Sequence, residues 1–184
     1  MKVPHLARWR RLDREGFELA RIYQTAGGWR LEGWCRLVDD EERMCSLDYA
    51  ITCDAGWRTR ELRLSGRLGP DLCGLTLTAD GEGTWTRDGR PCPEVDGCLD
   101  IDLEFSPATN LLPLRRLELA AGGPAVPVRA AWLRFPSLEL EPLDQTYQRQ
   151  SEHRVLYTSA TGFSAELDVD AEGFVLRYPG FAVQ

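Results

Sequence analysis

Apolar and polar side chains alternate along most of this chain, and a period of two residues is the pattern of half-buried β-strands. Residues 98–105 show it clearly, because Leu99, Ile101 and Leu103 are separated by Asp100 and Asp102. Gly-Gly and Asp-Gly turn signals recur between such segments, as in a meander of hairpins. The pattern predicts strands within residues 17–24, 29–38, 44–55, 57–68, 73–81, 83–89, 98–105, 126–135, 138–150, 153–159, 163–170 and 173–180.

Helical patterns are rare in this sequence. Only residues 8–15 and 143–150 are plausible short helices, and eleven prolines are scattered where a longer helix would have to form. We therefore predict a single all-β domain over residues 1–184, built on a mainly antiparallel sheet of roughly ten or more strands. A sheet of that size tends to curl, and its concave face is a natural place for a ligand.

The segment 98–119 carries the densest group of candidate functional residues. Asp100, Asp102 and Glu104 would share one face of a strand, with successive Cα atoms about 6.5 Å apart. The sequence Ser-Pro-Ala-Thr-Asn then interrupts the pattern before Arg115 and Arg116. Its prolines and self-bonding Thr and Asn side chains predict a stiff hairpin turn that places the two arginines opposite the acidic row.

Several interpretations of this acidic row remain open. Its spacing is close to the carboxyl separation of inverting glycosidases, which would make two of the acids a catalytic pair. Together with Asn110, the three carboxylates offer the oxygen ligands that calcium and magnesium prefer, although a strand holds them in an open line. The row could also clamp a ligand, or be a solvated face on which Asp100 or Asp102 pairs with Arg115 or Arg116.

Aromatic residues raise a second question. A turn marked by Asp54 precedes Trp57 and Arg58, and Trp57 is large enough to form the floor of a sugar or lipid site. Tyr147 and Tyr178 allow the same interpretation. Each of these rings could equally be packed in the core with its polar atom satisfied.

Composition and charge exclude some classes of function. The net charge of −7 disfavours a nucleic-acid partner, because binding to phosphates requires a basic field. No run of about 18 apolar residues could span a bilayer, and no signal-peptide core follows the first residues, so we expect a cytoplasmic protein. In a reducing compartment the six cysteines are expected to remain free thiols. With two histidines and no C-x-x-C pair, we predict neither a metal site nor a cofactor.

The chain resembles a known family. The segments "RWRRLDREGFE", "DYAITCDAGWRTR", "DGEGTWTRDG", "GCLDIDLEFSPATNLLPLRRLEL", "QTYQRQ" and "LDVDAEGFVLRYPG" are similar, in order, to those of the putative glycolipid-binding family of bacteria. The matching motif positions are Asp54, Trp57, Arg58, Asp100, Asp102, Thr109, Asn110, Pro113, Arg115, Arg116, Gln145, Tyr147, Tyr178 and Pro179.

This resemblance implies one strongly bent antiparallel sheet, forming a β-roll or partly open barrel similar in shape to bacterial lipoprotein carriers of acyl chains. It also implies non-enzymatic binding of a glycolipid or other amphiphile in the concavity, with no catalytic residues to assign. Two alternatives stay open: a hydrolase acting on a glycoconjugate through Asp100, Asp102 and Glu104, and a protein-interaction module without a small ligand. The expected ligand-binding residues are Asp54, Trp57, Arg58, Asp100, Asp102, Asn110, Arg115, Arg116, Tyr147 and Tyr178.

Overall fold

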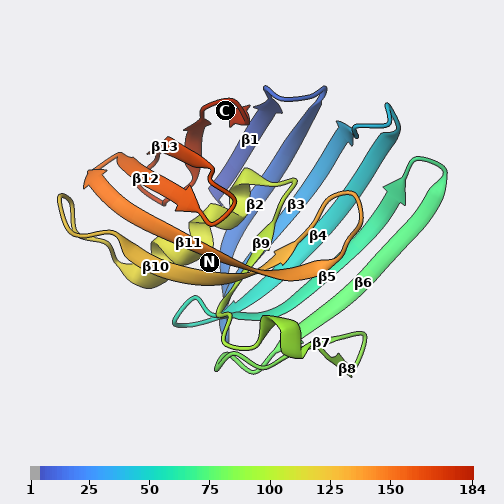
Figure 1. Cartoon of the computed structure of the whole chain (residues 1–184), viewed down its shortest axis with the longest axis horizontal. Coiled ribbons are helices and arrows are strands. Elements are labelled where there is room, and N and C mark those ends of the chain that lie inside the picture. The colour runs from blue at the N-terminus through green and yellow to red at the C-terminus, as the bar shows by residue number, and fades with distance from the viewer. Residues whose placement is uncertain (1–4) are drawn as a thin grey trace.

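The computed structural model describes residues 5–184 and contains one sheet of fifteen strands (Figure 1). The strands of the first half are β1 (His5–Arg11), β2 (Gly16–Thr25), β3 (Gly28–Val38), β4 (Met44–Asp54), β5 (Thr59–Leu68), β6 (Asp71–Ala79), β7 (Trp85–Arg87) and β8 (Arg90–Pro91). Those of the second half are β9 (Asp100–Leu103), β10 (Val126–Leu133), β11 (Leu140–Ser151), β12 (Arg154–Ser159), β13 (Ser164–Val169), β14 (Val175–Tyr178) and β15 (Ala182–Val183).

The two halves of the chain form the two arms of this sheet. Strands β1 to β8 follow one another outward on one side, and β15 back to β9 follow one another on the other. The arms join where β1 pairs antiparallel with β15, at Arg10–Val183 and Arg11–Ala182. Every neighbouring pair is antiparallel except β9 and β10, which are parallel. This connectivity is the meander that the turn signals predict.

The sheet bends until its second arm reaches over the first, but it does not close into a barrel. At the contact, the Thr59 amide of β5 donates to the Leu99 carbonyl at 3.0 Å, and the Ile101 amide of β9 donates to Thr59 Oγ1 at 3.1 Å. Strands β8 and β9 remain the two edges. The predicted fold class, a strongly bent sheet forming a partly open barrel, is confirmed.

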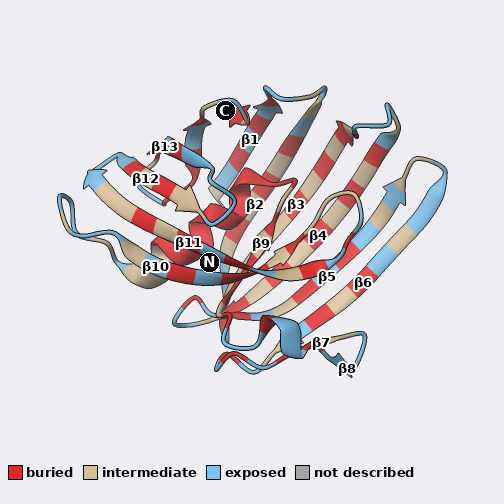
Figure 2. Cartoon of the chain, viewed as in Figure 1, coloured by how far each residue is buried: buried red, intermediate tan, exposed pale blue. Residues whose placement is uncertain are grey.

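Buried and exposed residues alternate along the strands, as Figure 2 shows for the first arm. Strand β4, for example, alternates buried with half-buried residues over ten successive positions. Inward side chains of both arms form the core, in which Trp9, Trp85, Tyr147, Phe105 and Phe174 are fully buried. The core therefore fills the bend between the arms.

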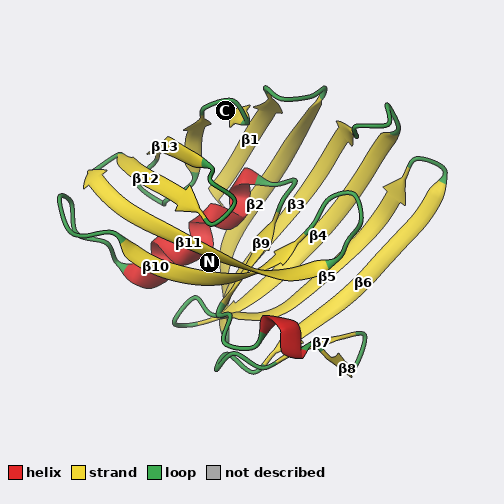
Figure 3. Cartoon of the chain, viewed as in Figure 1, coloured by secondary structure: helices red, strands yellow, loops and turns green. Residues whose placement is uncertain are grey.

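Within residues 5–184, helix is confined to three short segments: η1 (Pro93–Val95), η2 (Pro107–Asn110) and α1 (Leu111–Leu117) (Figure 3). The helices predicted at residues 8–15 and 143–150 are wrong. Residues 8–11 belong to β1, and residues 143–150 lie within β11. In both places burial follows a period of two, so packing into the sheet outweighs the local helical pattern. No helix in the described part of the chain is long and apolar enough to cross a membrane.

All six cysteines are free in the structure, and five are buried. Burial raises the pKa of Cys53 to about 12 and that of Cys98 to about 11, and it also raises the pKa of half-buried Cys73. Because the thiolate is the reactive form, buried thiols react slowly. We expect an alkylating reagent to modify Cys73 first in the folded protein, and all six thiols after denaturation without reductant. Fewer than six thiols in the denatured protein would reveal a disulfide.

Candidate functional site

The predicted hairpin over residues 98–119 is wrong, and the segment is instead a strand followed by helix. After β9 the chain forms η2 and α1, so Arg115 and Arg116 lie on a helix. Ser106 caps η2 by accepting the Ala108 amide at 3.1 Å, and Pro107 occupies the first helical position, where its missing N–H costs nothing. The helix is held in the bend of the sheet by its buried residues Leu111, Leu112, Pro113 and Leu114.

The ion pair expected between the acidic row and the arginines is present. The Arg116 guanidinium donates two hydrogen bonds to Asp100, Nε to Oδ1 at 3.0 Å and Nη2 to Oδ2 at 2.6 Å. Asp100 is only 1% exposed, and this burial raises its pKa, while Arg116 acts in the opposite direction. A carboxylate so deeply buried is not a solvated surface group, and the pair fixes α1 to β9.

A half-open pocket of about 310 Å³ lies on the inner side of the second arm. Strand β9 contributes Asp102 to it, the turn after β9 contributes Glu104, and η2 contributes Asn110. Five rings from β10, β12, the following turn and the β14–β15 region also line it: Trp132, Tyr157, Phe163, Tyr178 and Phe181. Of the predicted ligand-binding residues, this pocket brings together Asp102, Asn110 and Tyr178.

A hydrogen-bond network fixes the polar wall of the pocket. The Gln145 side-chain amide donates to Asp102 Oδ2 at 2.5 Å and lies 3.1 Å from the Tyr157 hydroxyl. Tyr147, itself buried behind the pocket, donates its hydroxyl hydrogen to Asn110 Oδ1 at 3.0 Å. Burial raises the pKa of Asp102 to about 6, although its bonds to Gln145 and Thr109 lower it. Asp102 therefore changes protonation near neutral pH.

Glu104 completes the pocket's acidic side in a different environment. Its Oε2 atom accepts the Phe135 amide at 2.7 Å and the Arg134 Nε hydrogen at 3.2 Å. The three acids of the row consequently have three roles: Asp100 is buried in an ion pair, Asp102 faces the pocket, and Glu104 lies at its rim. Asp100 and Asp102 share one face of β9, whereas Glu104 lies in the turn that follows the strand.

Four other predicted residues, Asp54, Trp57, Arg58 and Arg115, do not line this pocket. The Arg115 guanidinium sits 5.0 Å from the Trp57 ring centroid, and Trp57 stacks on Trp29 at 4.4 Å. Clefts of about 200 and 440 Å³ share Trp57 and Arg115. Asp54 caps the preceding turn by accepting the amides of Gly56 and Arg58, and Arg58 is exposed. Asp54, Trp57, Arg58 and Arg115 are thus separate from the pocket that contains Asp102.

Sequence reasoning missed a buried polar cluster beneath the pocket floor. Glu18 is fully buried, and its Oε1 atom accepts hydrogen bonds from the Tyr49 hydroxyl at 2.5 Å and from Ser106 Oγ at 2.6 Å. Its Oε2 atom is the buried side-chain atom that finds no hydrogen-bond partner in the described chain. Burial raises the pKa of Glu18 to about 7, opposed by these bonds and by Arg11. No local signal distinguishes Glu18 from other polar residues in strands.

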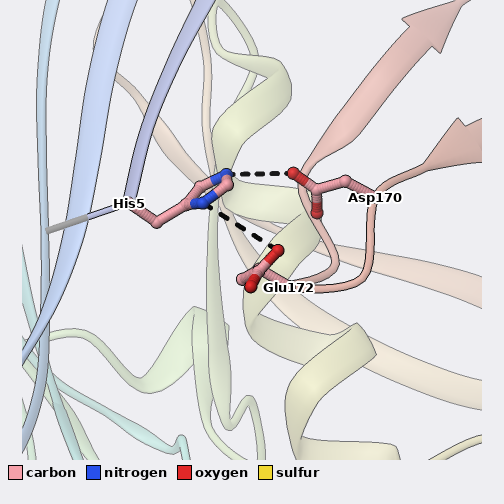
Figure 4. Close-up of side chains that lie close together, drawn as sticks. All are labelled: His5, Asp170 and Glu172. Carbon is pink, nitrogen blue, oxygen red and sulfur yellow. Dashed lines mark hydrogen bonds and ion pairs between the residues drawn. The ribbon is translucent and has the colours of Figure 1, made fainter. Parts of the chain in front are cut away.

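One group of side chains has the composition of a metal site. Figure 4 shows the His5 ring between the carboxylates of Asp170 and Glu172, with Nε2 3.0 Å from Asp170 Oδ2 and Nδ1 3.9 Å from Glu172 Oε2. The ring also stacks on Phe174 at 5.3 Å. Both ring nitrogens already face a carboxylate, so these contacts serve as a polar link between β1 and the turn before β14. The prediction that no metal is bound remains a prediction.

Known structures are similar to this fold over most of its length. A crystal structure of a DUF1089 family protein from Pseudomonas aeruginosa matches 91% of each chain with a TM-score of 0.82 and 34% sequence identity. A β-barrel-like protein of the domain of unknown function DUF1849 from Brucella abortus matches 98% of this chain and 93% of its own, with a TM-score of 0.57. Its identity of 11% shows similarity of fold alone. No protein with a curated description matches the sequence.

The bent single sheet, the helix inside its bend and the half-open pocket define a class of β-roll proteins that carry a recess on the concave face. Within that class, the sequence profile of one family, described as "Putative glycolipid-binding", matches residues 6–184. The match covers nearly the whole chain, and the protein belongs to this family.

Proposed function

We propose that this protein binds the head group of a glycolipid or related amphiphile in the pocket between β9, β12 and β14, without chemical turnover. The observation that carries the proposal is the lining of the pocket, where rings face a polar wall held by fixed hydrogen bonds. Aromatic rings suit the apolar faces of sugars, while Asp102 and Asn110 can bond sugar hydroxyls. Pockets that bind small molecules combine mostly apolar walls with a few placed polar groups in this way.

The size of the pocket limits what enters it. A volume of about 310 Å³ is at the lower end of the range of about 300–1,000 Å³ for ligand pockets. Next to this pocket, α1 packs its buried leucines Leu111, Leu112 and Leu114 into the bend. We therefore assign the pocket to a head group, with the acyl chains left outside it. This assignment is narrower than the binding of a whole amphiphile in the concavity, which the family resemblance implies.

One observation favours a hydrolase as the second candidate. Burial raises the pKa of Asp102 to about 6, and Glu104 lines the same pocket. Two neighbouring acids in different environments resemble the acid pair of a glycosidase. Turnover of nitrophenyl glycosides that disappears in Asp102→Asn would establish this function in place of simple binding. Absence of turnover together with saturable binding would support the proposal.

Binding can be measured with octyl glucoside as a soluble amphiphilic probe, by calorimetry below its micelle concentration. We expect saturable binding that Asp102→Asn weakens about tenfold or more, because hydrogen bonds to charged groups are worth about 1.5–3 kcal/mol. Phe163→Ala should also weaken binding, since Phe163 is 43% exposed at the pocket.

The matched control is Asp71→Asn, the same chemical change at an exposed position on β6 outside the pocket. It should bind the probe as the parent protein does. Lipid extracts that displace the probe would identify the natural ligand class by mass spectrometry. If neither the probe nor the extracts bind, the protein-interaction alternative is favoured and the proposal fails.

A further inference from the structure

Arginine alternates with other residues across the outer face of the sheet. The alternation runs from strand to strand, so it depends on the strand register and cannot be read along the chain. Residues directly opposite each other on neighbouring strands point to the same face. Following these partners from β14 through β15, β1, β2, β3, β4 and β5 to β6 gives one continuous row across the outer face. The row reads Arg177, Val183, Arg10, Phe17, Arg36, Ser46, Arg67 and Leu72.

The neighbouring rows on this face continue the positive charge. Arg8, Arg21, Arg30 and Arg63 lie on them, together with the acids Glu32, Asp48 and Glu61. We call the outward side chains of β1 to β6 with Arg177 and Val183 the arginine face. The rows named above hold eight arginines and three carboxylates, although the whole chain has a net charge of −7. Charge is therefore strongly segregated onto one side of the molecule.

Several of these arginines are not used to hold the fold. Arg36 bonds to Asp48 at 2.8 Å and Arg21 to Glu32 at 2.7 Å. In contrast, Arg8, Arg10 and Arg177 are exposed and make no ion pair or hydrogen bond through their side chains with any described residue. Their guanidinium groups remain available to an external partner.

Large apolar side chains are exposed on the same face as the free arginines. Phe17 is 54% exposed, Leu6 is 56% exposed and Leu72 is 79% exposed. Phe17 lies directly between Arg10 and Arg36 in the row. A shallow surface hollow of about 890 Å³ adjoins Arg8, Arg10, Leu12 and Phe17. Positive charge mixed with exposed apolar groups is the composition of surfaces that bind at the boundary between lipid head groups and acyl chains.

We propose that the arginine face docks on the surface of a bilayer that contains anionic phospholipids. Guanidinium groups bind phosphate oxygens in bidentate fashion, and each basic residue near an anionic membrane contributes about 1 kcal/mol. Phe17, Leu6 and Leu72 can enter the head-group layer between these contacts. A nucleic acid would satisfy the arginines but would leave the leucines exposed to water.

The acidic turn between β3 and β4 sets the orientation of the docked protein. Asp40, Glu41 and Glu42 are exposed at the end of these strands, and an anionic surface repels them. The protein therefore meets the bilayer with the outer face of β1 and β2 rather than with the tip of that turn. Arg177 and Tyr178 are neighbours on β14, so the docking surface and the head-group pocket lie on opposite faces of the same strand.

Vesicle cosedimentation tests this docking without any glycolipid, and so its outcome is independent of the pocket's ligand. We expect the full chain to bind vesicles of phosphatidylcholine mixed with phosphatidylglycerol, but not vesicles of phosphatidylcholine alone. Raising the salt from about 0.1 M to about 1 M shortens the Debye length from about 10 Å to about 3 Å and should release the protein. Arg10→Ala with Arg177→Ala should weaken binding about 25-fold, about fivefold for each arginine.

Two further variants separate docking from general electrostatic attraction. Phe17→Ser should also weaken binding, because it removes an apolar contact while the charge is unchanged. Arg58→Ala with Arg90→Ala is the matched control, since both arginines are exposed and lie outside the arginine face. The proposal would be overturned if the protein bound both kinds of vesicle equally or bound neither. It would also be overturned if the control and the Arg10/Arg177 variant lost vesicle binding to the same extent.

Discussion

Replacing Arg116 with alanine is expected to lower the free energy of unfolding by about 3–5 kcal/mol, the usual cost of removing one partner of a buried ion pair. Arg116 holds Asp100 through two hydrogen bonds, and Asp100 has almost no contact with water. Without the guanidinium, the Asp100 carboxyl stays buried but loses both hydrogen bonds and the opposite charge. Urea unfolding at neutral pH measures the loss, and Arg90→Ala, an exposed arginine on β8, should change stability by no more than about 0.5 kcal/mol.

The pH dependence of this loss identifies its cause. Burial raises the pKa of Asp100, and Arg116 lowers it, so the pKa rises further in Arg116→Ala. A carboxyl with a raised folded-state pKa contributes stability at low pH that is lost as pH increases. The difference between the variant and the parent should therefore be largest at neutral pH and shrink toward pH ~4. A loss that is constant with pH would mean that Arg116 stabilises the fold by packing alone.

The strands could be predicted because each depends on a local property, the alternation of buried and exposed side chains. The helix at residues 107–117 could not be separated from a hairpin by this criterion, since its leucines also fit a strand. A start signal was nevertheless present: Ser106 followed by Pro107 is the capping pattern of a helix N-terminus. The helices predicted at residues 8–15 and 143–150 are wrong because packing into the sheet outweighs a weak local preference for helix.

The pocket shows why a site is harder to predict than a strand. Asp102 and Asn110 are eight residues apart, and both were predicted from one motif. Gln145, which fixes Asp102, is 43 residues away on β11, and Phe181 comes from the turn before the last strand. These residues meet only because the sheet bends, and no sequence period encodes the bend. Trp57 and Arg115 carried equally suggestive chemistry, but they line two other clefts.

The same limitation applies to the arginine face. Along the chain, its arginines are spread over strands that are far apart in sequence, and the net negative charge indicates no basic surface. Strand register converts them into a row, because arginine alternates with another residue from each strand to the next. Surfaces of this kind require the pairing to be known first.

Glu18 is expected to make the protein more stable in mild acid than above neutral pH. In the folded protein, burial raises its pKa to about 7, whereas an unfolded glutamate has a pKa of about 4.5. Below the unfolded pKa, the carboxyl is protonated in both the folded and the unfolded state. As pH rises toward about 7, the carboxyl ionises in the unfolded chain but not in the folded one, and this ionisation stabilises the unfolded state. The difference corresponds to about 3 kcal/mol of stability lost by about pH 8.

Glu18→Gln tests this directly, since the amide keeps the oxygen that accepts from Tyr49 and Ser106 but does not titrate. Asp102, whose raised pKa acts in the same direction, still titrates in the variant, so a smaller pH dependence should remain. Urea unfolding measures the free energy of unfolding of both proteins between about pH 4 and about pH 8. From the low end of this range to the high end, the parent should lose about 3 kcal/mol more stability than Glu18→Gln. If the free energies of unfolding of the two proteins changed in parallel with pH, Glu18 would be ionised in the folded protein, with Arg11 as its counter-ion. Its unbonded oxygen would then carry no proton.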